Sequence, residues 1–224
     1  MADRLESQRP SRFDFGPAAR RYDLWYQTPD GQAHDRVQKA DVRRLLGEPT
    51  ASEQLLDVGC GTGHWSGFFA DMGYRVTGVD ISTEMIEVAR AAVPSGSFQV
   101  ADAHRLPFKD ASFDVVASMA TLEFCLDAQA AIKEMVRCAK PGGTMLIGTL
   151  NGLAELNRRR LAAGQQPYAS ARMFEPDTLQ KLLGPWGRVH MAASPVETAE
   201  GESPPRPGAL HRPGGPFLVA KVDL

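Results

Sequence analysis

Short apolar runs alternate with amphipathic stretches from about residue 54 to residue 150. Runs rich in Leu, Val and Ile predict buried strands, and segments with apolar residues at helical spacing predict helices. Alternation of this kind is typical of a parallel sheet with crossover helices. The strands are expected at 54–60, 74–81, 96–103, 113–120 and 144–150, and the helices at 64–73, 82–93 and 127–139.

Local signals mark where the helices in this block begin and end. Gly73 is expected to stop the first helix, and Ser82 is expected to cap the start of the second. The sequence KPGG at 140–143 is expected to end the third helix. These signals agree with the boundaries that the apolar pattern predicts.

The regions outside this block differ in character. Residues 1–50 predict a helical segment rich in aromatic residues and arginine, and residues 151–187 predict one helix at 153–164 and another after Pro176. Two further strands are expected at 188–197 and 215–224. The Pro- and Gly-rich stretch between them, 198–215, is too long for a tight turn, so we expect it to be mobile or to cover something.

Composition limits the class of protein. The chain has 224 residues, 43% hydrophobic and 23% charged, and a net charge of −2, which fits one globular domain and disfavours nucleic acid as a partner. Neither a signal-peptide pattern nor an apolar run of membrane-spanning length is present. Three cysteines without CxxC spacing predict reduced thiols in a cytoplasmic protein, and no metal site.

The sequence DVGCGTG, residues 57–63, is the first candidate for chemistry. Gly59, Gly61 and Gly63 lie where a predicted strand gives way to a helix, so the main chain can approach a ligand closely there. A tight turn without a ligand is the alternative. The dinucleotide fingerprint G-x-G-x-x-G needs glycine at position 64, where this chain has histidine. An NAD-linked oxidoreductase is therefore disfavoured.

Two acidic residues follow the next two strands. Asp80 ends the second strand, where a carboxylate can accept hydrogen bonds from both ribose hydroxyls. Asp102 ends the third, where its carboxylate can accept a proton from an exocyclic adenine amine, with the Ala103 amide nearby. Carboxyl ends of parallel strands share one sheet edge, so we expect one row that fits an adenine dinucleotide or an adenosyl-sulfonium cofactor.

Five motifs together resemble one family, the class I S-adenosylmethionine-dependent methyltransferases, and especially their type 11 small-molecule group. They cover residues 54–151 almost continuously: LLDVGCGTG, VTGVDIS, ADAHRLPFKDASFDVV, MATLEF and EMVRCAKPGGTMLIGTLN. The resemblance implies S-adenosylmethionine as cofactor. It also implies an α/β, Rossmann-like three-layer sandwich with a seven-stranded, mostly parallel sheet and one antiparallel strand near the C-terminus.

The resemblance also implies roles for parts of the chain. Residues 1–224 form a single methyltransferase domain, with a lid at 1–50, a cofactor-binding core at 51–151, a substrate-side insertion at 152–187 and a terminal strand pair at 188–224. The glycine turn surrounds the methionine part of the cofactor, Asp80 takes the ribose, and Asp102 takes the adenine. The implied cofactor-binding residues are Asp57, Gly59, Cys60, Gly61, Gly63, Asp80, Ile81, Asp102, Ala103 and Met119.

The acceptor is expected to be a small molecule such as a phenol, quinone precursor, amine or thiol. Methyl transfer from a sulfonium is an in-line displacement, so aligning the acceptor and excluding water supply much of the rate, and a base is needed only for a protonated nucleophile. Candidates for the acceptor site are Tyr22 and Tyr26, as an aromatic lid, and Glu123. MATLEF lacks the double proline of enzymes acting on nucleobase or amide amines.

Other readings stay open. A sensor that binds the cofactor without catalysis, or another non-catalytic homologue, is the alternative function. His104 is expected on the wrong side of the cofactor to act as a base. Arg172 either meets an anionic acceptor or is solvated, and Arg158–Arg160 predict a solvated helix face. Both a monomer and a homodimer fit the sequence.

Overall fold

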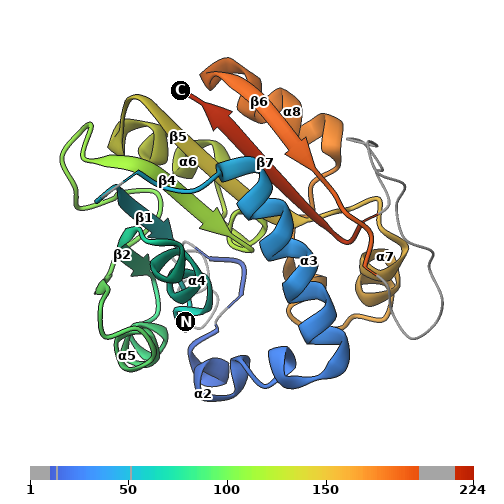
Figure 1. Cartoon of the computed structure of the whole chain (residues 1–224). Helices are drawn as coiled ribbons and strands as arrows, with labels where there is room; N and C mark the ends of the chain where they lie inside the picture. Colours follow the sequence, from blue (N-terminus) through green and yellow to red (C-terminus); the bar gives the residue numbers. More distant parts are fainter. Residues whose placement is uncertain (1–10, 14, 51, 197–214) are drawn as a thin grey trace, which may run out of the picture.

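A single seven-stranded sheet organises the chain in the computed structural model, which describes residues 11–13, 15–50, 52–196 and 215–224 (Figure 1). The strand order is β3-β2-β1-β4-β5-β7-β6. The strands are β1 (Gln54–Val58), β2 (Arg75–Asp80), β3 (Ser97–Val100), β4 (Phe113–Met119), β5 (Ala139–Leu150), β6 (Arg188–Ala192) and β7 (Phe217–Asp223).

Strand directions confirm the predicted fold class. The pairs β2–β3, β1–β2, β1–β4 and β4–β5 are parallel, whereas β7 runs antiparallel to both of its neighbours, β5 and β6. The central strand β1 is buried from Leu55 to Val58, which explains its near-continuous apolar sequence. The α/β, Rossmann-like sandwich with one antiparallel strand near the C-terminus is therefore correct.

Helices cover both faces of the sheet. The α-helices are α2 (Ala19–Tyr22), α3 (Pro29–Leu46), α4 (His64–Met72), α5 (Thr83–Ala92), α6 (Ala128–Cys138), α7 (Glu155–Ala162) and α8 (Pro176–Leu183). Five short 3-10 helices join them: η1 (Gly16–Ala18), η2 (Trp25–Gln27), η3 (Leu122–Phe124), η4 (Tyr168–Ser170) and η5 (Gly184–Trp186). Within the described parts of the chain, no helix combines the length and apolar character needed to cross a membrane.

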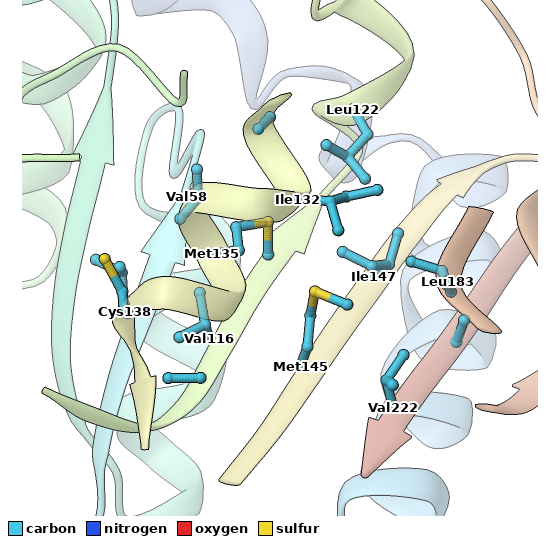
Figure 2. Packing of buried hydrophobic residues seen from close by; sticks show 14 of the residues in the cluster. Val58, Val116, Leu122, Ile132, Met135, Cys138, Met145, Ile147, Leu183 and Val222 are labelled. Carbon is cyan, nitrogen blue, oxygen red and sulfur yellow. The ribbon is translucent and has the colours of Figure 1, made fainter. Parts of the chain in front are cut away.

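Two large apolar clusters and a third, smaller one fill the space between the sheet and its helices. On one face, Ile132 and Met135 of α6 pack with Met145 of β5 and Leu183 of α8, and Figure 2 shows these side chains meeting over the strands. On the other face, Trp65 and Phe69 of α4 and Val42 of α3 pack against the opposite side chains of the same strands. Successive side chains of a strand point to opposite faces of the sheet, so each strand contributes apolar residues to both faces.

Side-chain caps fix several helix starts. The Ser82 hydroxyl accepts from the Met85 amide at the start of α5, as predicted. Asp127 caps α6 in the same way through the Ala130 amide, and Thr28 caps α3 ahead of Pro29. An N-cap of this type satisfies an amide that has no partner within the helix.

Three predicted boundaries were wrong. Strand β5 begins at Ala139 and not at Thr144, directly after α6 ends at Cys138, because a residue before proline, here Lys140, favours extended backbone. Strand β3 ends at Val100, so Asp102 lies in the turn that follows it. Strand β6 ends at Ala192, and most of the predicted stretch 198–215 lies outside the described residues.

Candidate functional site

The carboxyl ends of three neighbouring strands form one rim. Asp57 lies in β1, Asp80 ends β2, and Asp102 follows β3 by two residues. Strand pairing keeps them in one row, since the Gly59 amide donates to the Val79 carbonyl at 2.7 Å and the Ala101 amide donates to the Asp80 carbonyl at 2.9 Å. The row that the sequence predicts is therefore present.

The glycine turn uses each glycine differently. All three have positive φ, where other residues are strained. A Cβ on Gly59 would overlap the Thr121 side chain, and a Cβ on Gly63 would press on Ala89 of α5. A Cβ on Gly61 would meet nothing within 4 Å. Gly59 and Gly63 thus serve packing, whereas Gly61 faces open space.

Asp80 joins the glycine turn to helix α5. Its Oδ2 accepts from the Gly61 amide and its Oδ1 accepts from the Ser82 amide, both at 2.9 Å. Burial raises the pKa of this carboxyl, and the two amide donors oppose that rise. Each oxygen keeps a second lone pair, so Asp80 can still accept from a ligand hydroxyl.

Asp57 is fully buried beside this turn. Its Oδ2 accepts from the Ser66 hydroxyl at 2.7 Å, and its Oδ1 has no hydrogen-bond partner among the described residues. Burial raises its pKa to about 7, with a smaller contribution from the charge of Asp80. A buried acceptor atom without a donor indicates that a ligand group or a water molecule donates the missing hydrogen bond.

Asp102 is held by its neighbour in the chain. Its Oδ1 accepts from the His104 amide at 2.9 Å and lies 2.7 Å from His104 Nδ1. The Asp127 amide approaches His104 Nε2 at 3.4 Å, which fits a ring proton on Nδ1, facing Asp102. Oδ2 of Asp102 is therefore the oxygen that can accept a hydrogen bond from a ligand.

These residues surround a first cavity of about 900 Å³, counted with its open mouth. Nine of the ten predicted cofactor residues line it, and Gly63 does not, since it packs against α5 instead. His104, which we expected on the wrong side of the cofactor to act as a base, lines this first cavity and not the second one described below. The nine predicted residues in its wall are Asp57, Gly59, Cys60, Gly61, Asp80, Ile81, Asp102, Ala103 and Met119.

A second cavity of about 1070 Å³, again with its mouth, adjoins the first. Residues from α3, η3, α7 and η4 and from the start of β7 contribute to its wall. The acceptor candidate Glu123 lines this second cavity and not the first, whereas Tyr22 and Tyr26 line both. The residues common to both walls are Tyr22, Tyr26, Trp65, Ala120 and Phe124.

The N-terminal segment is fastened over the glycine turn. The Thr62 hydroxyl donates to Asp23 at 2.7 Å, and His64 Nε2 lies 2.6 Å from Asp35 of α3. The Tyr26 ring stacks on His64, with centroids 3.7 Å apart and planes within 7°. Tyr22 ends α2, and Tyr26 lies in the separate short helix η2.

Glu123 and Asn157 are the fully buried polar side chains of the second cavity. Thr149 Oγ1 donates to Glu123 at 2.9 Å and the Leu150 amide donates at 3.2 Å. Burial raises the pKa of Glu123 to about 7. The Asn157 Nδ2 donates to two backbone carbonyls, and its Oδ1 has no partner in the described structure.

Several residues that line the second cavity were not predicted from the sequence. Asn157, Tyr168 and Arg160 line it, although the run Arg158–Arg160 predicts a solvated face. Arg158 and Arg159 are indeed exposed. Arg172 is also exposed and lines neither cavity; its backbone amide donates to the Glu123 carbonyl. Among the described residues, no cluster of three His, Cys, Asp or Glu side chains is arranged to hold a metal.

Comparison with known proteins agrees with this geometry. A family model described as a methyltransferase domain matches residues 56–147. A malonyl-[acyl-carrier protein] O-methyltransferase of Pseudescherichia vulneris is 30% identical over 199 residues, covering 87% of this chain and 75% of that protein. One of Serratia marcescens is 37% identical over 116 residues, covering 51% of this chain and 46% of its own length. The chain thus spans about half the length of several curated relatives that it matches.

Solved structures share the fold. A SAM-dependent methyltransferase of Thermotoga maritima, described as a possible histamine N-methyltransferase, has a TM-score of 0.72 and 24% identity. The match covers 93% of this chain and 97% of that one. The topology is that of a Rossmann-like protein, with a row of acidic residues at the strand ends. The chain belongs to the class I S-adenosylmethionine-dependent methyltransferases.

Proposed function

We propose that the chain transfers a methyl group to a small molecule, with the cofactor in the first cavity and the acceptor in the second. The observation that carries this proposal is the wall shared by the two cavities, formed by Tyr22, Tyr26, Trp65, Ala120 and Phe124. A donor and an acceptor must meet in line and away from water for displacement to occur. Two adjoining cavities with common aromatic residues meet that requirement.

The residues of the first cavity fit S-adenosylmethionine. The Asp57 Oδ1 lacks a donor, and Gly61 leaves open space above the main chain. We assign Asp57, Gly59, Cys60 and Gly61 to the methionine part, Asp80 and Ile81 to the ribose, and Asp102, Ala103 and Met119 to the rest of the adenosyl group. When bound, the cofactor supplies a methyl group on a positively charged sulfur. The chain supplies orientation and a site that excludes water.

We propose a separate role for each segment of the chain. Residues 1–50 act as a lid, supported by the contacts of Asp23 with Thr62 and of Asp35 with His64. Residues 51–151 hold the cofactor, residues 152–187 contribute α7 and η4 to the acceptor cavity, and residues 188–224 complete the sheet. We also propose a cytoplasmic location, supported by three cysteines that are all free thiols.

Carboxyl methylation is a second candidate. The relatives are named as O-methyltransferases of malonyl-[acyl-carrier protein], whose malonyl group ends in a carboxylate. The specific observation in its favour is Arg160, whose guanidinium lies 4.4 Å from the Tyr168 ring centroid in the wall of the second cavity. Arginine is a common partner of carboxylates.

Calorimetry with S-adenosylhomocysteine, followed by turnover with methyl-labelled cofactor, tests the proposal. We expect a single saturable binding event and a labelled small molecule after incubation with cell extract. NADH serves as the control and should give no heat. Binding without any labelled product would favour a non-catalytic sensor, and absence of binding would contradict the cofactor assignment.

A further inference from the structure

The two fully buried polar side chains of the second cavity, Glu123 and Asn157, offer hydrogen-bond acceptors. Both oxygens of Glu123 already receive a donor, from the Thr149 hydroxyl and the Leu150 amide, and each retains a lone pair. The Asn157 amide is oriented by its two donations, to the Asn151 carbonyl at 2.9 Å and to the Pro216 carbonyl at 2.7 Å. Its Oδ1 is therefore an acceptor that lacks a donor.

Aromatic side chains form much of the remaining wall. The faces of such rings attract cations, and a desolvated site strengthens that attraction. Some of them are ordered by contacts with one another, since Trp25 packs on Tyr26 with centroids 5.0 Å apart. The aromatic lining residues are Tyr22, Trp25, Tyr26, Trp65, Phe124, Tyr168 and Phe217.

We propose that the second cavity accepts a primary or secondary amine, which binds as an ammonium group to Glu123 and Asn157 Oδ1 and is then methylated on nitrogen. This inference rests on the proposed function and names its acceptor class. An ammonium group carries the donors that the Asn157 Oδ1 lacks and the charge that suits an aromatic wall beside a carboxylate.

Glu123 also supplies the proton acceptor that this reaction needs. An ammonium nitrogen has no lone pair, so an N–H bond must break first, and the proton passes to a Glu123 oxygen. The free amine then forms a bond to the methyl carbon while the carbon–sulfur bond breaks and its electron pair stays on sulfur. The products are an N-methylammonium ion and S-adenosylhomocysteine, and Glu123 releases its proton to water.

The electrostatic surroundings of Glu123 suit this role. Burial raises its pKa to about 7, so it changes protonation near neutral pH. The titratable groups whose charges interact with it are Tyr22 and Cys125, and burial raises the pKa of both, so they stay neutral. His34, in the same wall, has its pKa lowered by burial and by the charge of Arg160.

A carboxylate acceptor fits Glu123 and Asn157 less well than an ammonium group does. It has no proton for Asn157 Oδ1, and its charge would oppose that of an ionised Glu123. Arg160 is half-exposed, in contrast to the buried Glu123 and Asn157. Arg160 is therefore less desolvated than Glu123 and Asn157 and holds a charged group less strongly.

Calorimetry with a matched pair of probes tests the inference. The probes are 2-phenylethylamine and 3-phenylpropionate, which share an aromatic ring and differ in the charged end, each titrated into protein saturated with S-adenosylhomocysteine. We expect the amine to bind at least about tenfold more tightly, in the range of a hydrogen bond to a charged group. Its affinity should rise as the pH increases through 7.

Glu123→Gln provides the decisive variant, and Glu155→Gln is its matched control, since Glu155 is exposed on α7 and lines neither cavity. Glu123→Gln should weaken amine binding by about tenfold or more, without changing the affinity for S-adenosylhomocysteine. Glu155→Gln should change neither affinity.

Three results would overturn the inference while leaving the proposed function intact. They are tighter binding of 3-phenylpropionate, no binding of the amine to cofactor-loaded protein, and unchanged amine affinity in Glu123→Gln. Failure of S-adenosylhomocysteine to bind would instead contradict the proposed function, and the acceptor assignment with it.

Discussion

Asp80 has a structural task besides the ribose contact that we propose for it. Its two oxygens hold the Gly61 and Ser82 amides, which fixes the glycine turn against the start of α5. A carboxylate held by two amides is already oriented before any ligand arrives, so little entropy is lost on binding. Loss of this side chain therefore affects both the turn and the ligand.

Asp80→Ala should weaken the affinity for S-adenosylhomocysteine by at least about tenfold, because removing a charged partner costs roughly 1.5–3 kcal/mol. Calorimetry of the purified variant measures this directly. Asp177→Ala, at an exposed position in α8 that lines neither cavity, is the control and should bind as the unmodified chain does. Equal affinity in Asp80→Ala would remove the ribose assignment.

The placement of a single site residue was predictable where the residue belongs to a local sequence motif. Asp57, Asp80 and Asp102 follow apolar runs, so their strand ends place them on one rim. Asn157 and Arg160 lie in a polar helix whose periodicity gives no sign of a cavity. The burial of Asn157 depends on where α7 packs against the chain around Pro216, a contact between residues far apart in sequence.

At the scale of elements, two glycines of the same turn differ in what surrounds them. A side chain at Gly59 would overlap Thr121, whereas one at Gly61 would enter open space in the first cavity. Both positions have positive φ, which costs an alanine roughly 1–2 kcal/mol. Gly59→Ala and Gly61→Ala therefore carry a similar cost for positive φ. They differ in the atoms that the new methyl group contacts.

Gly59→Ala should lower the melting temperature clearly more than Gly61→Ala does. Gly61→Ala should retain most of the stability and lose most of the affinity for S-adenosylhomocysteine, because its methyl group occupies space that we assign to the cofactor. Thermal unfolding and calorimetry on the same two preparations separate these effects. A Gly61→Ala chain that binds normally would show that the ligand does not lie over this turn.

Helices and strands were predictable from the sequence where nearby residues determine them. The strands and helices of residues 54–150 follow from apolar period and caps, and most boundaries differ by one to three residues. The early start of β5 was missed because pairing of Ala139 with Phe113 precedes a register shift, which no local pattern reveals. The docking of residues 11–46 depends on contacts with Thr62 and His64, so the sequence alone does not give it.

At the scale of the whole molecule, two buried acids couple stability to pH. Burial raises the pKa of Asp57 and of Glu123 to about 7. The unfolded chain releases the Glu123 proton near its ordinary value of 4.5, whereas the folded chain keeps it up to about 7. The contribution of Glu123 to stability is therefore complete below about pH 4.5 and is lost as the pH rises through 7.

Glu123→Gln should flatten this dependence. Glutamine cannot ionise, and its amide can still pair with the Leu150 amide and the Thr149 hydroxyl. Between pH 5 and pH 8, the free energy of unfolding should fall less in the variant than in the unmodified chain, by an amount on the order of 1–3 kcal/mol. Urea titrations across this range measure it. Parallel curves for the two proteins would contradict the raised pKa.

We assign the rim formed by Asp57, Asp80 and Asp102 to an adenosyl sulfonium cofactor. A crystal structure of the chain with S-adenosylhomocysteine tests it most directly. The predicted result is electron density along the first cavity, with the ribose hydroxyls at Asp80 and the adenine amine at Asp102. Density for the ligand at another place, or a first cavity that stays empty at saturating ligand, would contradict it.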